Sequence, residues 1–416
     1  MKYFLRFLLA LVISAIVVIT YGSREAVGNK HSRVGRIANM TSQGSNNSNK
    51  VKQDGLLLEI REPQIIALAI PENKPNATAP VKLAVVVTNN TQTSIPFRIS
   101  GALIPEIVGS DGQALHRKEP KNRQVGVGKY DCVLLGVGEQ IGISLDARLS
   151  WQNNLLQLVV PNSPDYWQIP TNFDNSWSFD TLGSGEYQVR FSYDSPVGNV
   201  FCLDPQTGQE KIIEVIETGK LTTPFANLRL IQPVGFNNNA VEVDGIHFET
   251  LMPEQLLTVL NKRRNAESSV QIGMRITNNT PTPFYFSFYA TFTPDLVMPD
   301  GQVERGGYNS DWMRLPEESD FLLVTPGKSM TFFPSITLSL RKRDNFSLLV
   351  TNGYGGYCPF DSLKPGIYHF RFQYYNTSDT IPKKNLAGES IESRPIEKVW
   401  TGWVDTPFVE FSIVQP

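Results

Sequence analysis

Residues 186–193 read EYQVRFSY, and residues 367–374 read IYHFRFQY. Large apolar residues alternate with other residues in both stretches. The alternating apolar positions are Tyr187, Val189, Phe191 and Tyr193 in the first stretch and Tyr368, Phe370, Phe372 and Tyr374 in the second. A period of two is typical of an extended strand with one buried face. The two stretches therefore predict equivalent β-strands, with Arg190 and Arg371 on the opposite, outward face.

These strands belong to a long internal repeat. The runs 88–93, 105–113 and 179–187 return, with small changes, as 277–282, 294–302 and 360–368. Each copy ends alike, with a Thr-Pro-Phe triplet before a final Gln-Pro. The period is too long for a solenoid, whose units span about 20–50 residues. We therefore expect two homologous domains, residues 55–234 and residues 235–416.

Other elements are also predicted to be extended. Residues 81–87 and 270–276 read as strands that end at Asn-Asn-Thr turns, and Asp111-Gly112 and Asp300-Gly301 are matched hairpin signals. Residues 253–262 carry the best helical pattern, but they align with residues 63–70. One shared position in both copies favours a strand, so the predicted class is all-β.

Residues 182–189 (LGSGEYQV) and 363–370 (LKPGIYHF) resemble the stretch of immunoglobulin domains in which a tyrosine hydroxyl bonds back to the backbone. Val189 and Phe370 replace the strand cysteine of that family, so its inter-sheet disulfide is not expected. Residues 400–411 are similar to the last strand of Ig-like domains in uncharacterised secreted bacterial proteins. The resemblance implies two tandem Ig-like antiparallel β-sandwiches and no particular activity.

The amino terminus has the pattern of an export signal. Lys2 and Arg6 precede the apolar run 7–21. As a helix, this run spans roughly 22 Å, less than the ~30 Å bilayer core. Residues 1–22 are therefore either a cleaved signal peptide or a membrane anchor formed by residues 3–21. Residues 23–54 are polar and predict a flexible linker, and the rest is expected outside the cytoplasm: periplasmic, cell-surface or extracellular.

Composition excludes some classes of function. The net charge of the 416-residue chain is −2, which gives no general reason to expect nucleic-acid binding. Two short basic clusters, 262–264 and 341–343, read as solvated turns or as contacts for an anionic surface. Three cysteines make neither a disulfide framework nor a zinc site. Cys132 aligns with Phe321, so it is either a small buried hydrophobe or the partner of Cys202.

No catalytic pattern stands out. Hydrolase elbows, nucleotide loops and metalloprotease or calcium-loop motifs are missing from the sequence, which predicts a protein without enzymatic activity or cofactor. The four histidines read as surface residues. Acidic positions shared by the copies favour turn chemistry over a divalent-cation site. These shared positions are Glu106/Asp295, Asp111/Asp300, Asp131/Asp320 and Asp180/Asp361.

The second copy is richer in aromatic residues. Strand alternation in residues 284–289 places the phenylalanines on one face and Tyr285 and Tyr289 on the other. Nearby predicted loops add Tyr308, Trp312, Tyr354 and Tyr357. These residues predict either an aromatic binding surface or packing between the domains.

Together these features favour an exported, non-catalytic binding or scaffolding protein of the cell envelope. It would act through sandwich-end loops or the aromatic face of the second domain, on an envelope protein or polysaccharide. The alternative is a secreted module resembling a proteinase inhibitor. Its extended loop would be residues 302–316, with Arg305 at the contact.

Overall fold

The computed structural model describes residues 50–415 except residues 54, 62–64, 75–76, 100, 122–131, 163–175, 195–197, 205–206, 216–220, 236–237, 260–265, 308, 310–313, 343, 354 and 385–389. The predicted signal or anchor (1–22) and most of the predicted linker (23–54) lie outside these residues. All described residues belong to one compact unit of the chain. No helix of the described part is long and apolar enough to cross a membrane.

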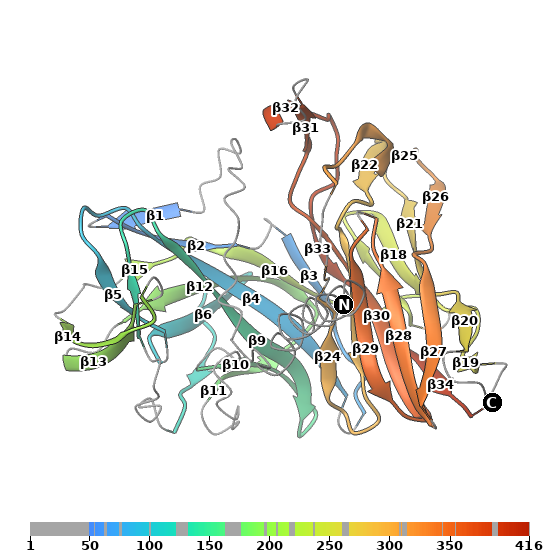
Figure 1. The fold of residues 1–416 in the computed structure, drawn as a ribbon, viewed down its shortest axis with the longest axis horizontal. Helices are drawn as coiled ribbons and strands as arrows, with labels where there is room; N and C mark the ends of the chain where they lie inside the picture. The colour runs from blue at the N-terminus through green and yellow to red at the C-terminus, as the bar shows by residue number, and fades with distance from the viewer. Residues whose placement is uncertain are drawn as a thin grey trace, which may run out of the picture. The chain divides into compact units, whose positions relative to one another are not determined.

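The chain is all-β, as predicted (Figure 1). In the described residues, the one helical element is the 3₁₀ turn η3 (Glu318–Asp320). The strands of the first sequence copy are β1 (Lys50–Gln53), β2 (Leu56–Ile60), β3 (Ile65–Ala69), β4 (Thr78–Asn89), β5 (Ile95–Arg98), β6 (Leu103–Gly109), β7 (Arg117–Lys118), β8 (Cys132–Leu135), β9 (Gln140–Gln152), β10 (Leu155–Pro161), β11 (Ser176–Leu182), β12 (Gly185–Tyr193), β13 (Gly198–Leu203), β14 (Glu210–Val215), β15 (Leu221–Thr222) and β16 (Ala226–Ile231).

The strands of the second copy follow a matching order. They are β17 (Ala240–Val243), β18 (Ile246–Leu251), β19 (Leu256–Leu257), β20 (Glu267–Val270), β21 (Gly273–Asn278), β22 (Phe284–Ser287), β23 (Phe292–Val297), β24 (Val303–Arg305), β25 (Phe321–Val324), β26 (Lys328–Phe332), β27 (Ile336–Lys342), β28 (Asn345–Thr351), β29 (Tyr357–Leu363), β30 (Gly366–Asn376), β31 (Thr380–Lys384), β32 (Ser390–Pro395), β33 (Gly402–Asp405) and β34 (Val409–Ile413). In segments 63–70 and 253–262, the described residues include the strands β3 and β19 and no helix.

The predicted strand 270–276 is interrupted, unlike its match β4. The structure has β20 and β21 there, with a break before Gly273. A Cβ atom at Gly273 would lie 2.5 Å from the carbonyl oxygen of Phe332, so the neighbouring strand approaches too closely for a side chain. β20 pairs with β27 and β21 with β18 and β26, so the second copy divides between two sheets a strand that the first copy keeps in one.

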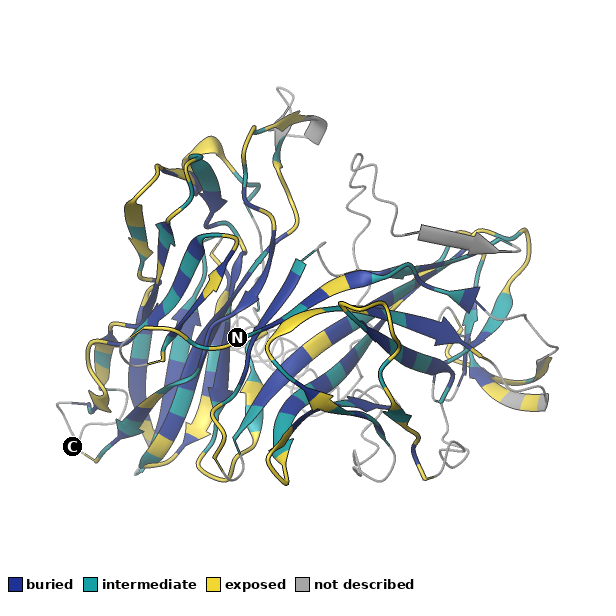
Figure 2. Cartoon of the chain, turned by 180° about the vertical axis from the view of Figure 1, so that it is seen from behind, coloured by how far each residue is buried: buried dark blue, intermediate teal, exposed yellow. Residues whose placement is uncertain are grey.

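Strand alternation builds the cores. Val189, Phe191 and Tyr193 of β12 are buried, and so are Tyr368 and Phe370 of β30. Figure 2 shows this alternation of buried and more exposed residues along the long strands. In the first copy, a seven-stranded sheet has the order β1-β2-β4-β9-β10-β11-β7. Antiparallel sheets that bury one apolar face in a shared core are typical of β-sandwiches.

Matched residues of the two copies make matched contacts. The Tyr187 hydroxyl donates to the carbonyl of Gly183 at 3.2 Å, and the Tyr368 hydroxyl donates to the carbonyl of Lys364 at 2.7 Å. Each hydroxyl also accepts the backbone N–H of the same residue, at 3.0 and 2.9 Å. The tyrosine contact implied by the resemblance to immunoglobulin domains is therefore present in both copies.

The Asn-Asn-Thr turns also repeat their bonds. Asn89 donates through its side chain to the carbonyls of Thr93 and Leu135, both at 2.9 Å. Asn278 donates to the carbonyls of Thr282 and Val324, both at 2.8 Å. Both asparagines are fully buried. Each therefore ties its turn to the neighbouring strand, because a buried amide needs partners for its N–H groups.

One sheet runs through both copies. Its main path is β15-β12-β16-β3-β33-β30-β23-β24, and the copies join where β3 pairs in parallel with β33. Ala67 and Ala69 of β3 pack into the hydrophobic core of the second copy. The first copy thus completes the core of the second, which the repeat pattern alone did not predict.

The cysteines differ in state. Cys132 and Cys202 form a disulfide bond that joins β8 to β13, and both residues are fully buried. Of the two alternatives left by the sequence, Cys132 is the partner of Cys202. Cys358 is a free thiol in the core, and burial raises its pKa to about 12, so it stays protonated at neutral pH.

Candidate functional site

Arg314 organises one end of the second copy. Its guanidinium donates to the Asp320 carboxylate, with one bond at 2.6 Å, and to the carbonyl of Gly353 at 2.8 Å. The guanidinium also lies 5.3 Å from the ring centroid of Tyr289, whose hydroxyl donates to the Arg314 carbonyl. The Asp320 carboxylate raises the pKa of Arg314. Three separated segments are thus fixed by one permanently charged side chain.

The segment around Gly353 leads to Tyr357, which begins β29 and is 41% exposed. Its backbone exchanges two hydrogen bonds with Asn309, at 2.8 and 3.0 Å. Asn352 accepts the N–H of Gly356 through its side chain at 2.7 Å. These bonds fix the backbone of Asn309, Gly356 and Tyr357 while the Tyr357 side chain stays accessible.

Tyr285 lies in the short sheet β22–β25, directly opposite Leu323. Leu322 and Leu323 are 46% and 48% exposed, and Tyr285 is half-buried. The other side of Tyr285 exchanges backbone bonds with Lys398 and Trp400, both at 2.9 Å. We use the term loop-end surface for the accessible residues on the two segments that Arg314 connects: Tyr285, Leu322 and Leu323 on the β22–β25 pair, and Tyr357 on β29.

The structure thus brings Tyr289 against Arg314 and leaves Tyr357 accessible. The other predicted aromatic residues, Tyr308, Trp312 and Tyr354, lie outside the described residues, as does the basic cluster 262–264. Arg341 is an exposed residue of β27. The hydroxyl of Tyr289 is engaged within the fold, so Tyr289 supports the frame more than it offers a free surface.

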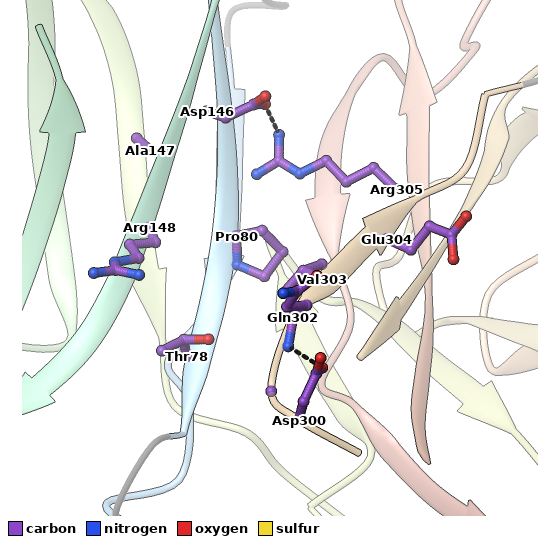
Figure 3. A pocket seen from close by; sticks show the side chains of 11 residues that line it. Thr78, Pro80, Asp146, Ala147, Arg148, Asp300, Gln302, Val303, Glu304 and Arg305 are labelled. Atoms are coloured by element: carbon purple, nitrogen blue, oxygen red, sulfur yellow. Dashed lines mark hydrogen bonds and ion pairs between the residues drawn. The ribbon is translucent and has the colours of Figure 1, made fainter. Parts of the chain in front are cut away.

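Arg305 has different surroundings. It lies in β24 opposite Asp295 and forms an ion pair with Asp146 of the first copy. Both side chains line a cleft of about 670 Å³ together with Pro80, Arg148 and residues 300–304. Figure 3 shows Arg305 reaching across this cleft to Asp146. Arg305 therefore connects the two copies and is not presented on a protruding loop.

Beside this cleft, Arg371 is buried between two carboxylates. Its Nε donates to Asp295 at 2.9 Å, and its Nη2 donates to the carbonyl of Pro80 at 2.8 Å. The Asp405 Oδ2 is also 2.8 Å from Nη2 but outside hydrogen-bond geometry, so that attraction is coulombic. The Cζ atom of Arg371 lies 4.7 Å from the centroid of the Phe408 ring. All three charged side chains are about 1% exposed.

The two carboxylates compete for one guanidinium. Burial raises the pKa of Asp405 to about 6, and the nearby Asp295 acts in the same direction, while Arg371 and the indole N–H of Trp403 oppose it. Two carboxylates around one cation resist full ionisation in a dry interior. This cluster can therefore take up a proton near pH 6, although nothing else in it resembles a catalytic constellation.

The remaining predicted positions have structural partners. Asp111 and Asp300 each accept a backbone N–H two residues on, at 3.0 Å, as turn residues do. Asp361 accepts the Ser347 hydroxyl at 2.6 Å, Asp180 pairs with Lys118, and Asp131 lies outside the described residues. Among described residues, no group of three or more potential ligands could hold a metal ion.

The sequence patterns did not predict the buried cluster of Arg371, Asp295 and Asp405, although the sequence contained an indication of it. The outward arginine and its acidic partner occur in both copies, as Glu106–Arg190 and Asp295–Arg371. A solvent-exposed strand face does not need an ion pair, so an arginine–carboxylate pair at the same outward position in both copies indicates a role in packing. Its burial in the second copy depends on the first copy lying over it.

Comparison with known proteins adds no identification. No protein-family model matches the chain, and no curated protein is detectably similar to it in sequence.

Proposed function

We propose that the chain is an exported, non-catalytic binding or scaffolding protein of the cell envelope, built from two tandem Ig-like β-sandwiches that arose by duplication. The paired tyrosine contacts and paired asparagine turns support this architecture. The export signal rests on residues 1–22 of the sequence, and the proposed location follows from it.

The observation that carries the binding role is the loop-end surface. Exposed apolar and aromatic side chains there stand on segments fixed by Arg314, Asp320 and backbone pairing. Rigid presentation lowers the entropy lost on binding, and tyrosine is common among residues that dominate binding energy. The partner would be an envelope protein or a polysaccharide.

Co-sedimentation of the full chain with purified peptidoglycan, envelope polysaccharide and membrane fractions tests this role. We expect binding to one fraction, weakened at least about tenfold by Leu323→Ser or Tyr357→Ala. Ile212→Ala is the matched control, because Ile212 is 66% exposed but lies on β14 of the first copy. Equal binding by all variants, or binding to none of the fractions, would contradict the proposal.

The inhibitor-like alternative depends on Arg305. Its ion pair with Asp146 and its place in β24 leave it 19% exposed, so it is not the free contact residue that an inhibitory loop needs. We therefore place envelope binding first. Unchanged rates across a panel of proteases, with and without the purified chain, would exclude the alternative.

A further inference from the structure

The contact between the two copies is asymmetric, because each copy contributes a different side. The second copy contributes the strand β33 and the outward row Arg305, Asp295, Arg371 and Phe408. The first copy contributes the strand β3, the Pro80 carbonyl and the Asp146 carboxylate. Each copy has a version of both sides, but the contact uses only one side of each copy. The equivalent of the β33 side on the first copy and the equivalent of the β3 side on the second copy therefore remain without a partner, and we call them the unused sides. Both unused sides can be located in the structure.

The first unused side is on the first copy and matches the side that β33 provides. β15 pairs with β12 as β33 pairs with β30, and no described strand pairs with its other edge. The adjoining row matches as well: Arg190 donates to Glu106 at 2.8 Å and lies 4.4 Å from the Phe225 ring centroid. Arg190 and Glu106 remain 33% and 30% exposed, compared with 1% for Arg371 and Asp295.

The second unused side is on the second copy and matches the side that β3 provides. β19 pairs in parallel with β34, as β3 pairs with β16, and no described strand covers its other edge. Leu256 pairs with Ser412 of β34 as Ala67 pairs with the equivalent Arg229 of β16, so the strand register matches Leu256 of β19 to Ala67 of β3. Ala67 is fully buried in the core of the other copy, whereas Leu256 is 63% exposed. The exposed Leu256 therefore occupies the position at which, in the first copy, Ala67 packs into the core of the other copy.

The two unused sides carry different polar groups. Near the first side, Arg190 is half-buried and His116, the match of Arg305, is exposed. On the second side, the strand matched to β4 presents the exposed carboxylate of Glu267, and the match of Asp146 is the exposed Ser335. Strand edges without a hydrogen-bonded partner are templates for pairing.

We propose that the unused sides bind each other between molecules, so that a second copy of this chain adds head to tail. In this assembly, β19 of one molecule joins β15 of the next in parallel, as β3 joins β33 within the chain. Leu256 enters the core beside β15, and Arg190 reaches the backbone of the matched strand. Because the contact does not close on itself by symmetry, growth continues into linear oligomers. The assembly is separate from the loop-end surface, so it stands or falls independently of envelope binding.

Sedimentation velocity of the full chain at increasing concentration tests this proposal. We expect the weight-average sedimentation coefficient of the wild type to rise with concentration. Leu256→Lys, which blocks the β19 side, and His116→Glu/Arg190→Ala, which blocks the β15 side, are each expected to remain monomeric. Far-UV circular dichroism checks that both variants are folded, and Ile212→Ala, exposed elsewhere, should assemble like the wild type.

Mixing the two blocked variants gives the decisive result. Each retains the side that the other lacks, so an equimolar mixture should form 1:1 dimers that do not grow further. A wild type that stays monomeric at all concentrations, blocked variants that assemble like the wild type, or a mixture that yields no dimer would each overturn the proposal.

Discussion

Arg190 and Arg371 occupy matched positions of β12 and β30 but lie in different environments. Each pairs with an acidic neighbour and lies over a phenylalanine ring. Arg190 is one-third exposed, so water competes for its charge, whereas Arg371 is almost completely buried. The energetic importance of the pair therefore depends on burial and not on the chemistry of the residues.

Replacing each arginine by methionine should separate these environments. Arg371→Met leaves the carboxylates of Asp295 and Asp405 buried without their cation, and we expect a loss of about 3–5 kcal/mol in the free energy of unfolding. Arg190→Met removes only a solvent-screened pair, so a loss below about 1 kcal/mol is expected. Urea unfolding of both variants measures the difference; similar losses would show that the two pairs are equally screened.

Asp405 should make stability depend on pH. Its pKa is raised from 3.8 to about 6 in the folded protein. A raised pKa means that the folded state holds the proton more tightly, so the stability gained from protonation is fully present below the unfolded pKa of about 4 and is lost as the pH rises through about 6. Near neutral pH, the ionised carboxylate of Asp405 therefore destabilises the folded state.

We expect Asp405→Asn to be more stable than the wild type at about pH 7.5, by roughly 1–3 kcal/mol, with the advantage shrinking towards about pH 4.5. The charged groups that face the site, Asp295, Arg371 and Arg305 nearby and Asp146, Arg148 and Lys82 beyond them, are unchanged in this variant. Thr222 already occupies the matched position in the first copy, so a neutral residue suits the frame. Chemical unfolding over this pH range tests the claim, and a pH-independent difference would contradict it.

At the scale of elements, the bond between Cys132 and Cys202 connects strands that neighbour each other only in space. β8 and β13 pair in parallel, and the cysteines are 70 residues apart in sequence. The matched position in the second copy is Phe321, which packs without a covalent link. The disulfide is therefore an addition to a frame that both copies share.

The variant Cys132→Ser/Cys202→Ser should lose about 2–4 kcal/mol, because the bond closes a long loop in the unfolded chain. A lower melting temperature is expected for this variant, and reduction of the wild type with dithiothreitol should produce a similar decrease. Cys358→Ser serves as the control for reductant sensitivity, since Cys358 takes no part in the bond. An unchanged melting temperature after verified reduction would rule out this stabilising role.

At the scale of the whole molecule, β3 makes the copies interdependent. It pairs with β16 of its own copy and with β33 of the other, and it also supplies Ala67 and Ala69 to the second core. A domain that borrows a strand cannot bury its core alone. The described part of the chain is therefore expected to unfold as one cooperative unit.

Differential scanning calorimetry should show a single transition for the wild type. Leu68→Pro removes a backbone N–H from a central strand of the joined sheet and should destabilise both copies together by about 3 kcal/mol or more. Val137→Ala, at a turn residue that is 60% exposed, is the control and should leave the transition unchanged. Two well-separated transitions in the wild type would contradict the interdependence.

The loop-end surface was only partly predictable. Strand alternation placed Tyr285 and Tyr289 away from the phenylalanines, but it gave no sign that the Tyr289 hydroxyl bonds to Arg314. Arg314 and Leu323 were not singled out, because a loop arginine and a leucine in a short strand have no distinguishing pattern. Their roles arise from segments that meet only after folding.

Local sequence patterns predicted the strand class, the turns and a match between the two halves, since period-two alternation and turn residues act over a few neighbours. The folded chain was needed to show that β3 joins the sheets, that Cys132 pairs with Cys202, and that Arg371 is buried while Arg190 is not. The physical reason is that burial depends on what lies over a strand face, and the covering element here comes from a distant part of the chain.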